Sequence, residues 1–231
     1  LRKAGSPDPV TAGTLFQAGS VSKPLAAVAA MRLVEAGKLS LDEDVNLRLA
    51  SWKVSYAEEM GREKVTLRRL LSHTAGFGDN YHDGYLEREA IPTTLESLEG
   101  KGKGRKAQLE RIPGSGYAYS NAGYLVIQKL LEDLSGKAFP DLLRDAVIVP
   151  AGMQRATFEM RLPKTLREDS ASGHDLEGQP IEGGWRLYAE LASAGLCTTA
   201  SDLARFLVGM QKSVRGEEGG LLKPEMARDV V

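Results

Sequence analysis

The chain has 231 residues, of which 42% are hydrophobic, so it is long enough to bury a sizeable core. Its 30 basic and 31 acidic side chains give a net charge of −1, which provides no electrostatic basis for binding nucleic acid or an anionic membrane. An apolar run of roughly 18 residues, the length that crosses a bilayer, does not occur. Cys197 is the single cysteine and the histidines share no ligand spacing, so an intrachain disulfide is excluded and no metal site is expected.

The first predicted element is an apolar helix that begins near Ser20 and ends at Gly37. Residues 24–36 are apolar nearly all round, which is typical of a buried helix. Ser20 and Lys23 are three residues apart, so a helix places both side chains on one face. A serine hydroxyl needs a neighbouring base to become a nucleophile, and a lysine that burial keeps partly neutral can act as that base. The pair is a candidate acylation site, although an isolated S-x-x-K is more often a surface pair without a function.

A short helix over residues 66–71 follows, after an extended connector at residues 39–45. A long irregular region rich in Gly and Pro then runs over residues 76–116, interrupted by a predicted helix at residues 94–98. Irregular regions of this size usually border a functional site. His82 lies in this region and is a candidate to line a cleft.

Tyr119 and Asn121 lie on a turn-rich segment just before a helix that Gly136 ends. A phenol there can relay protons to and from a serine or a leaving group, and an amide can hold a lysine and a substrate carbonyl. The alternative for each residue alone is structural, because Ser120 or Asn121 is a good helix N-cap and the tyrosine can be a packing residue. The pairing with the first motif is what favours catalysis.

Two aromatic residues in the last third of the chain are candidates for the wall of an acyl pocket. They are Trp185 and Tyr188, and core packing is the alternative for both. Beyond them, apolar residues keep a helical period over residues 202–211, with Ser201 as the predicted N-cap. A last helix is predicted to begin near Pro224.

Four stretches in this order resemble the penicillin-recognising serine hydrolases, in particular the class C β-lactamase and esterase branch. They are Phe16–Pro24, Val65–Gly76, Tyr119–Asn121 and Ala194–Leu207. The resemblance implies an α+β fold, the α/β sandwich of the β-lactamase and D,D-peptidase type, with no metal or organic cofactor. It implies that Ser20 is the nucleophile and that Lys23 takes its proton. It also implies that Tyr119 is a second acid/base and that Asn121 positions Lys23 and the substrate.

One element of that family has no match in a credible place. The family carries a Lys- or His-Thr/Gly-Gly element on a late strand, which also supplies a backbone N–H of the oxyanion hole. His73 to Gly76 is similar in letters, but it follows a predicted helix and matches an earlier landmark. We therefore expect residues 1–231 to form a single β-lactamase-related domain, mainly its helical lobe, with N- and C-terminal sheet strands missing. Loss of one oxyanion donor typically lowers turnover by about 100- to 1000-fold.

The function that these residues favour is acyl transfer to water through an acyl-enzyme. The expected substrate is a small acyl compound: an ester, a D-amino-acid peptide or a β-lactam, with an esterase or peptidase activity preferred. The alternative is a catalytically impaired binding or assembly module that keeps the pocket and has lost turnover. An α/β-hydrolase is disfavoured because no G-x-S-x-G elbow occurs. The sequence leaves the compartment and the oligomeric state open.

Overall fold

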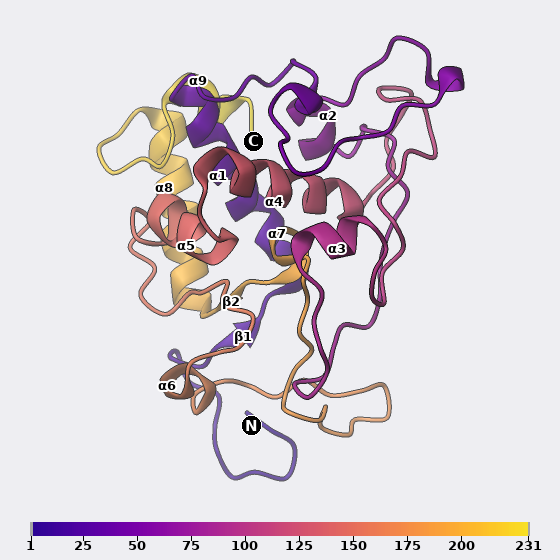
Figure 1. Ribbon diagram of the computed structural model, residues 1–231. Helices are drawn as coiled ribbons and strands as arrows, with labels where there is room; N and C mark the ends of the chain where they lie inside the picture. The colour runs from indigo at the N-terminus through magenta and orange to yellow at the C-terminus, as the bar shows by residue number, and fades with distance from the viewer. Residues whose placement is uncertain (1, 231) are drawn as a thin grey trace.

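The computed structural model describes residues 2–230 as a helix-rich molecule with a small sheet (Figure 1). Two long helices, α1 (Ser22–Glu35) and α4 (Asn121–Ser135), contact each other at its centre. The shorter helices surround them, and irregular chain covers much of the rest. The helical elements are η1 (Gly19–Val21), η2 (Val45–Leu47), η3 (Glu58–Met60), α2 (Leu67–Leu71), α3 (Thr94–Leu98), α5 (Phe139–Leu143), the π-helical turn η4 (Arg144–Ile148), α6 (Lys164–Arg167), α7 (Leu191–Ala194), α8 (Ala200–Arg215) and α9 (Pro224–Arg228).

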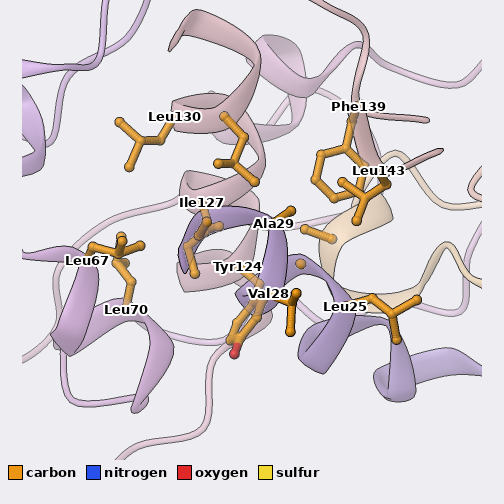
Figure 2. Close-up of a cluster of buried hydrophobic side chains, with 14 of the residues drawn as sticks. Leu25, Val28, Ala29, Leu67, Leu70, Tyr124, Ile127, Leu130, Phe139 and Leu143 are labelled. Carbon is orange, nitrogen blue, oxygen red and sulfur yellow. The ribbon is translucent and has the colours of Figure 1, made fainter. Parts of the chain in front are cut away.

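The core lies where α1, α2, α4 and α5 meet, as Figure 2 shows. α1 is buried over most of its surface, in agreement with its apolar sequence. Helices α1, α2, α4 and α5 are held together by side chains that are almost wholly excluded from water. Those labelled in Figure 2 are Leu25, Val28, Ala29, Leu67, Leu70, Tyr124, Ile127, Leu130, Phe139 and Leu143.

Most helix boundaries follow the predicted capping residues. The Thr66 side chain accepts a hydrogen bond from the Arg69 N–H at the start of α2, and α4 ends at Gly136, which has a φ of 66°. The prediction that Ser201 caps the late helix is wrong. Thr199 has the extended backbone of an N-cap, and its side chain accepts a hydrogen bond from the Asp202 N–H, so Ser201 already lies inside α8.

In the described residues the sheet has two strands, β1 (Phe16–Gln17) and β2 (Cys197–Thr198). They are antiparallel and pair Phe16 with Thr198 and Gln17 with Cys197. β1 leads directly into η1 and α1, while β2 follows α7. The strand pair therefore brings the chain that leads into the first motif beside a distant segment, with Gln17 opposite Cys197. Across residues 2–230, every helix is too short or too polar to traverse a bilayer.

Candidate active site

Ser20 and Lys23 lie at the junction between η1 and α1. Ser20 belongs to the 3-10 turn and is exposed, whereas Lys23 lies in the first turn of α1 and is only 5% exposed. The Lys23 Nζ lies 3.1 Å from the Ser20 Oγ. The three-residue spacing therefore brings amine and hydroxyl into direct contact, as a helical turn requires.

The N-terminus of α4 supplies the next two groups. Ser120 caps the helix through a hydrogen bond from the Gly123 N–H to its side chain, and this fixes the residues on either side. The Tyr119 hydroxyl lies 2.8 Å from the Ser20 Oγ, and the Asn121 Oδ1 accepts a hydrogen bond of 2.8 Å from the Lys23 Nζ. The structure thus brings Ser20, Lys23, Tyr119 and Asn121 into one cluster.

A third oxygen completes the hydrogen-bond partners of the Lys23 amine, after those of Ser20 and Asn121. The Ser193 carbonyl, in α7, accepts a hydrogen bond of 3.1 Å from Nζ. The Asn121 Oδ1 and this carbonyl can only accept, so a neutral amine uses its two N–H groups on them. Its lone pair then faces the Ser20 hydroxyl, which is the arrangement a proton acceptor needs.

Burial lowers the pKa of Lys23, because desolvation disfavours the charged amine. Tyr119 and, more weakly, Asp79 act in the opposite direction. The Nζ lies 4.8 Å from the ring centroid of Tyr119 and 5.4 Å from that of Tyr124. Burial raises the pKa of Tyr124 to about 12, so its phenol stays protonated at neutral pH.

Two residues of the loop after α2 hold this end of α4 in place. The Asp79 Oδ1 accepts hydrogen bonds from the Asn121 backbone N–H and from its Nδ2, at 3.0 and 3.1 Å. Because Nδ2 is engaged there, Oδ1 is the atom that faces Lys23. His73, with a φ of 57°, accepts the Ser120 N–H through Nδ1. Its role is structural, and burial lowers its pKa.

A pocket of about 230 Å³ opens beside Ser20. Its walls come from η1, from the loop at residues 80–82, from the start of α4 and from the segment that ends in α7. Its lining consists of Gln17, Gly19, Ser20, Asn80, Tyr81, His82, Asn121, Tyr188, Glu190, Ser193 and Ala194. The predicted substrate-binding residues His82 and Tyr188 are therefore both in the lining, with ring centroids 5.7 Å apart.

Trp185 lies outside this pocket, contrary to its prediction as a wall residue. It packs against a separate small cluster of Leu15, Leu162 and Cys197. The Arg167 guanidinium also lies over the Trp185 ring, 5.6 Å from its centroid. The packing alternative therefore holds for Trp185.

A sequence profile of the Beta-lactamase family matches residues 1–230. The chain belongs to the β-lactamase family. Penicillin-binding protein 4 of Amycolatopsis lactamdurans is 31% identical over 207 residues, which are 85% of this chain and 51% of that protein. Esterase EstB of Burkholderia gladioli is 31% identical over 189 residues, which are 78% of this chain and 46% of the esterase. An octameric penicillin-binding protein homologue from Pyrococcus abyssi superposes with a TM-score of 0.76 at 26% identity, covering 98% of this chain and 50% of that one.

The predicted family and fold type are thus confirmed, and the chain spans about half the length of these three proteins. Within the β-lactamase-family fold, the described residues form a helix-rich part with the two-stranded sheet. Four groups near Ser20 were not predicted from the sequence: Asp79, Asn80, Glu190 and Ser193. Ser193 contributes a backbone carbonyl, which no side-chain pattern reveals. The other three lie in irregular segments, where no periodicity marks the direction of a side chain.

Proposed function

We propose that this protein is a serine hydrolase that works through an acyl-enzyme. Ser20 is the nucleophile, Lys23 is the base that takes its proton, Tyr119 relays protons, and Asn121 positions Lys23. The observation that carries the proposal is the set of contacts at the Lys23 amine. Two oxygens that can only accept occupy its N–H groups, and the remaining position meets the Ser20 hydroxyl at 3.1 Å.

The reaction proceeds in two displacements. As the Ser20 Oγ bonds to the carbonyl carbon of the substrate, its proton passes to the Lys23 Nζ. The resulting ammonium returns this proton to the leaving group through the Tyr119 hydroxyl, which lies 2.8 Å from the Oγ. The leaving group departs and an ester on Ser20 remains. A water molecule then attacks that ester and gives a proton to the same relay, which returns it to the Ser20 Oγ as the carboxylic acid leaves.

The substrate class that we propose is a small acyl compound, an ester or D-amino-acid peptide in preference to a β-lactam. A pocket of about 230 Å³ lies below the usual range for drug-sized ligands, so a compact acyl group fits it better than a large one. The relatives named above are called an esterase and a penicillin-binding protein, which is consistent with this range of acyl chemistry.

The second candidate is a binding or assembly module without turnover. A Lys- or His-Thr/Gly-Gly element is the feature that would distinguish the hydrolase from this module. That element would bring an oxyanion donor worth about 100- to 1000-fold in turnover. Acylation of Ser20 separates the two candidates, because a binding module does not need an activated nucleophile.

A fluorophosphonate probe tests the proposed function. We expect stoichiometric labelling of Ser20, found by intact mass and peptide mapping. We expect none in Ser20→Ala, and at least about 100-fold slower labelling in Lys23→Ala, because general-base catalysis contributes about 100- to 10,000-fold. Ser6→Ala is the matched serine control and should label normally; Ser6 ends a turn near the N-terminus, where its N–H donates to the Lys3 carbonyl. A folded chain that resists the probe would support the module instead.

A further inference from the structure

One acidic residue in the wall of the pocket takes no part in the proposed acyl chemistry. Glu190 is 4% exposed and lines the pocket together with Ser20. Its Oε2 lies 3.1 Å from the His82 Nε2. Among residues 2–230, lysine and arginine side chains are all beyond ion-pair distance of this carboxylate, and the pocket lining contains neither residue type.

His82 does not neutralise the carboxylate. The Gly84 N–H donates a hydrogen bond of 2.9 Å to the His82 Nδ1, so this nitrogen must offer a lone pair. The ring is therefore held as the tautomer with hydrogen on Nε2, which donates to Glu190. The imidazole in this arrangement is neutral, so His82 gives the carboxylate a hydrogen bond but no compensating charge. A buried carboxylate without a cation is costly, and a bound cation would remove that cost.

Asn80 is a second, independent sign that the pocket is built for a polar ligand. It is 2% exposed and belongs to the same lining. Both its Oδ1 and its Nδ2 lack hydrogen-bond partners in the described part of the chain. Buried amides are normally paired, so an unpaired one in a pocket wall calls for a ligand group. With Glu190, it offers two acceptors to a donor-rich ligand.

We propose that Glu190 binds the ammonium group of a substrate whose acyl part carries a free amine, with the Asn80 oxygen as the second acceptor. The substrate class is then aminoacyl esters and amides with an unblocked amine, rather than their N-acylated forms. An ammonium supplies three N–H donors and the compensating charge, and hydrogen bonds between charged groups are about twice as strong as neutral ones. This inference rests on the proposed function in one respect, that the amine belongs to the acyl group that Ser20 attacks.

Calorimetric binding of phenylalaninamide tests the ammonium site without any need for catalysis. Both enantiomers are titrated into the chain below neutral pH, where the amine is charged, and each is compared with its N-acetyl derivative. We expect at least one enantiomer to bind about tenfold or more tightly than its N-acetyl form. Glu190→Gln keeps an acceptor for His82 and removes the charge, so it should abolish this preference. Glu177→Gln removes an equal charge from an exposed turn and should retain it.

Equal binding of the amine and the N-acetyl derivative to the wild-type chain would overturn the proposal, as would a preference that survives in Glu190→Gln. If that variant does not fold, the wild-type comparison decides the question by itself. Fluorophosphonate labelling of the wild-type chain reports the proposed function separately. Labelling without an ammonium preference removes this inference alone. A preference without labelling removes the hydrolase and leaves the ammonium site in place.

Discussion

A neutral Lys23 amine has two N–H groups but three neighbouring oxygens, which belong to Ser20, Asn121 and Ser193. The Asn121 Oδ1 and the Ser193 carbonyl oxygen accept these two N–H groups, and neither oxygen carries a hydrogen that it could donate to Lys23. The Ser20 hydroxyl is the neighbour that can reverse its direction and donate. Burial favours the neutral amine, and in that state the geometry points the proton of Ser20 at the base that removes it.

The pH profile of acylation follows from this state. The labelling rate of Ser20 should rise with pH with a midpoint below pH 10.5, the ordinary pKa of a lysine, and then level off. Burial lowers the pKa of Lys23, so the neutral amine is fully populated at a lower pH than that of a free lysine. Labelling rates followed by intact mass from acidic to strongly alkaline pH give the curve. A rate that climbs tenfold per pH unit beyond 10.5 would rule out this base.

At the scale of elements, the site is the meeting point of two helix N-termini. The start of α1 carries Ser20 and Lys23, and the start of α4 carries Tyr119 and Asn121. The Ser120 side chain accepts the Gly123 N–H and donates to the Gly78 carbonyl, so it joins α4 to the loop that holds Asp79. The N-cap residue of α4, Ser120, therefore also holds Tyr119 and Asn121 in position.

Substitution of this cap should affect stability and labelling together. Ser120→Ala is expected to lower the free energy of unfolding by about 1–2 kcal/mol and to slow the labelling of Ser20, because Tyr119 and Asn121 flank it. Thr199→Ala removes the N-cap of α8 and is the matched control, with a similar loss of stability and normal labelling. Chemical denaturation and intact mass measure the two effects. Equal labelling of both variants would show that the cap does not support the site.

Elements that are specified by neighbouring residues could be predicted from the sequence, and features that depend on distant contacts could not. The helix over residues 94–98 and the cap at Thr66 were predicted correctly, because capping and periodicity act within a few residues. The prediction of Ser201 as a cap was wrong because Ser201 and Thr199 are both good cap residues, and the sequence does not say which one is extended. Ser20 and Lys23 lie in contact, as their three-residue spacing predicted. Trp185, Glu190 and Asn80 lie in irregular chain, where side-chain direction depends on distant contacts such as the bridge between Tyr85 and Leu187.

At the scale of the molecule, one buried amide connects the core to the pocket. Gln128 lies in the middle of α4 and is 1% exposed. Its Nε2 donates to the Thr94 Oγ1 at 2.9 Å and to the Ala189 carbonyl at 3.0 Å, and its Oε1 accepts the Ala192 N–H at 3.0 Å. Two of these partners, Ala189 and Ala192, lie on either side of Glu190 in the sequence. The packing of α4 therefore fixes the position of the pocket wall that Glu190 forms.

Gln128→Leu should therefore weaken both the fold and the site. It leaves a buried carbonyl and a buried N–H without partners, which is expected to cost about 2–4 kcal/mol of unfolding free energy and to slow the labelling of Ser20. Leu130→Ala, also buried in α4, should cost about 2–5 kcal/mol through its cavity and leave labelling unchanged at temperatures where the chain is folded. Thermal denaturation and labelling rates compare the two variants. Loss of stability without slower labelling in Gln128→Leu would separate this contact from the site.

The proposed catalytic groups lie at the starts of helices and much of the pocket wall lies on irregular segments, so substrate selectivity can change separately from the catalytic geometry. The groups proposed to move protons lie at helix starts that pack into the core. In contrast, Asn80, His82, Tyr188 and Glu190 lie on two irregular segments, which the backbone bridge between Tyr85 and Leu187 joins. Substitutions in those two segments change which substrates fit the pocket, while Ser20, Lys23 and Tyr119 keep their relative positions. A library randomised at these four positions alone would therefore explore new selectivities at little risk to the chemistry.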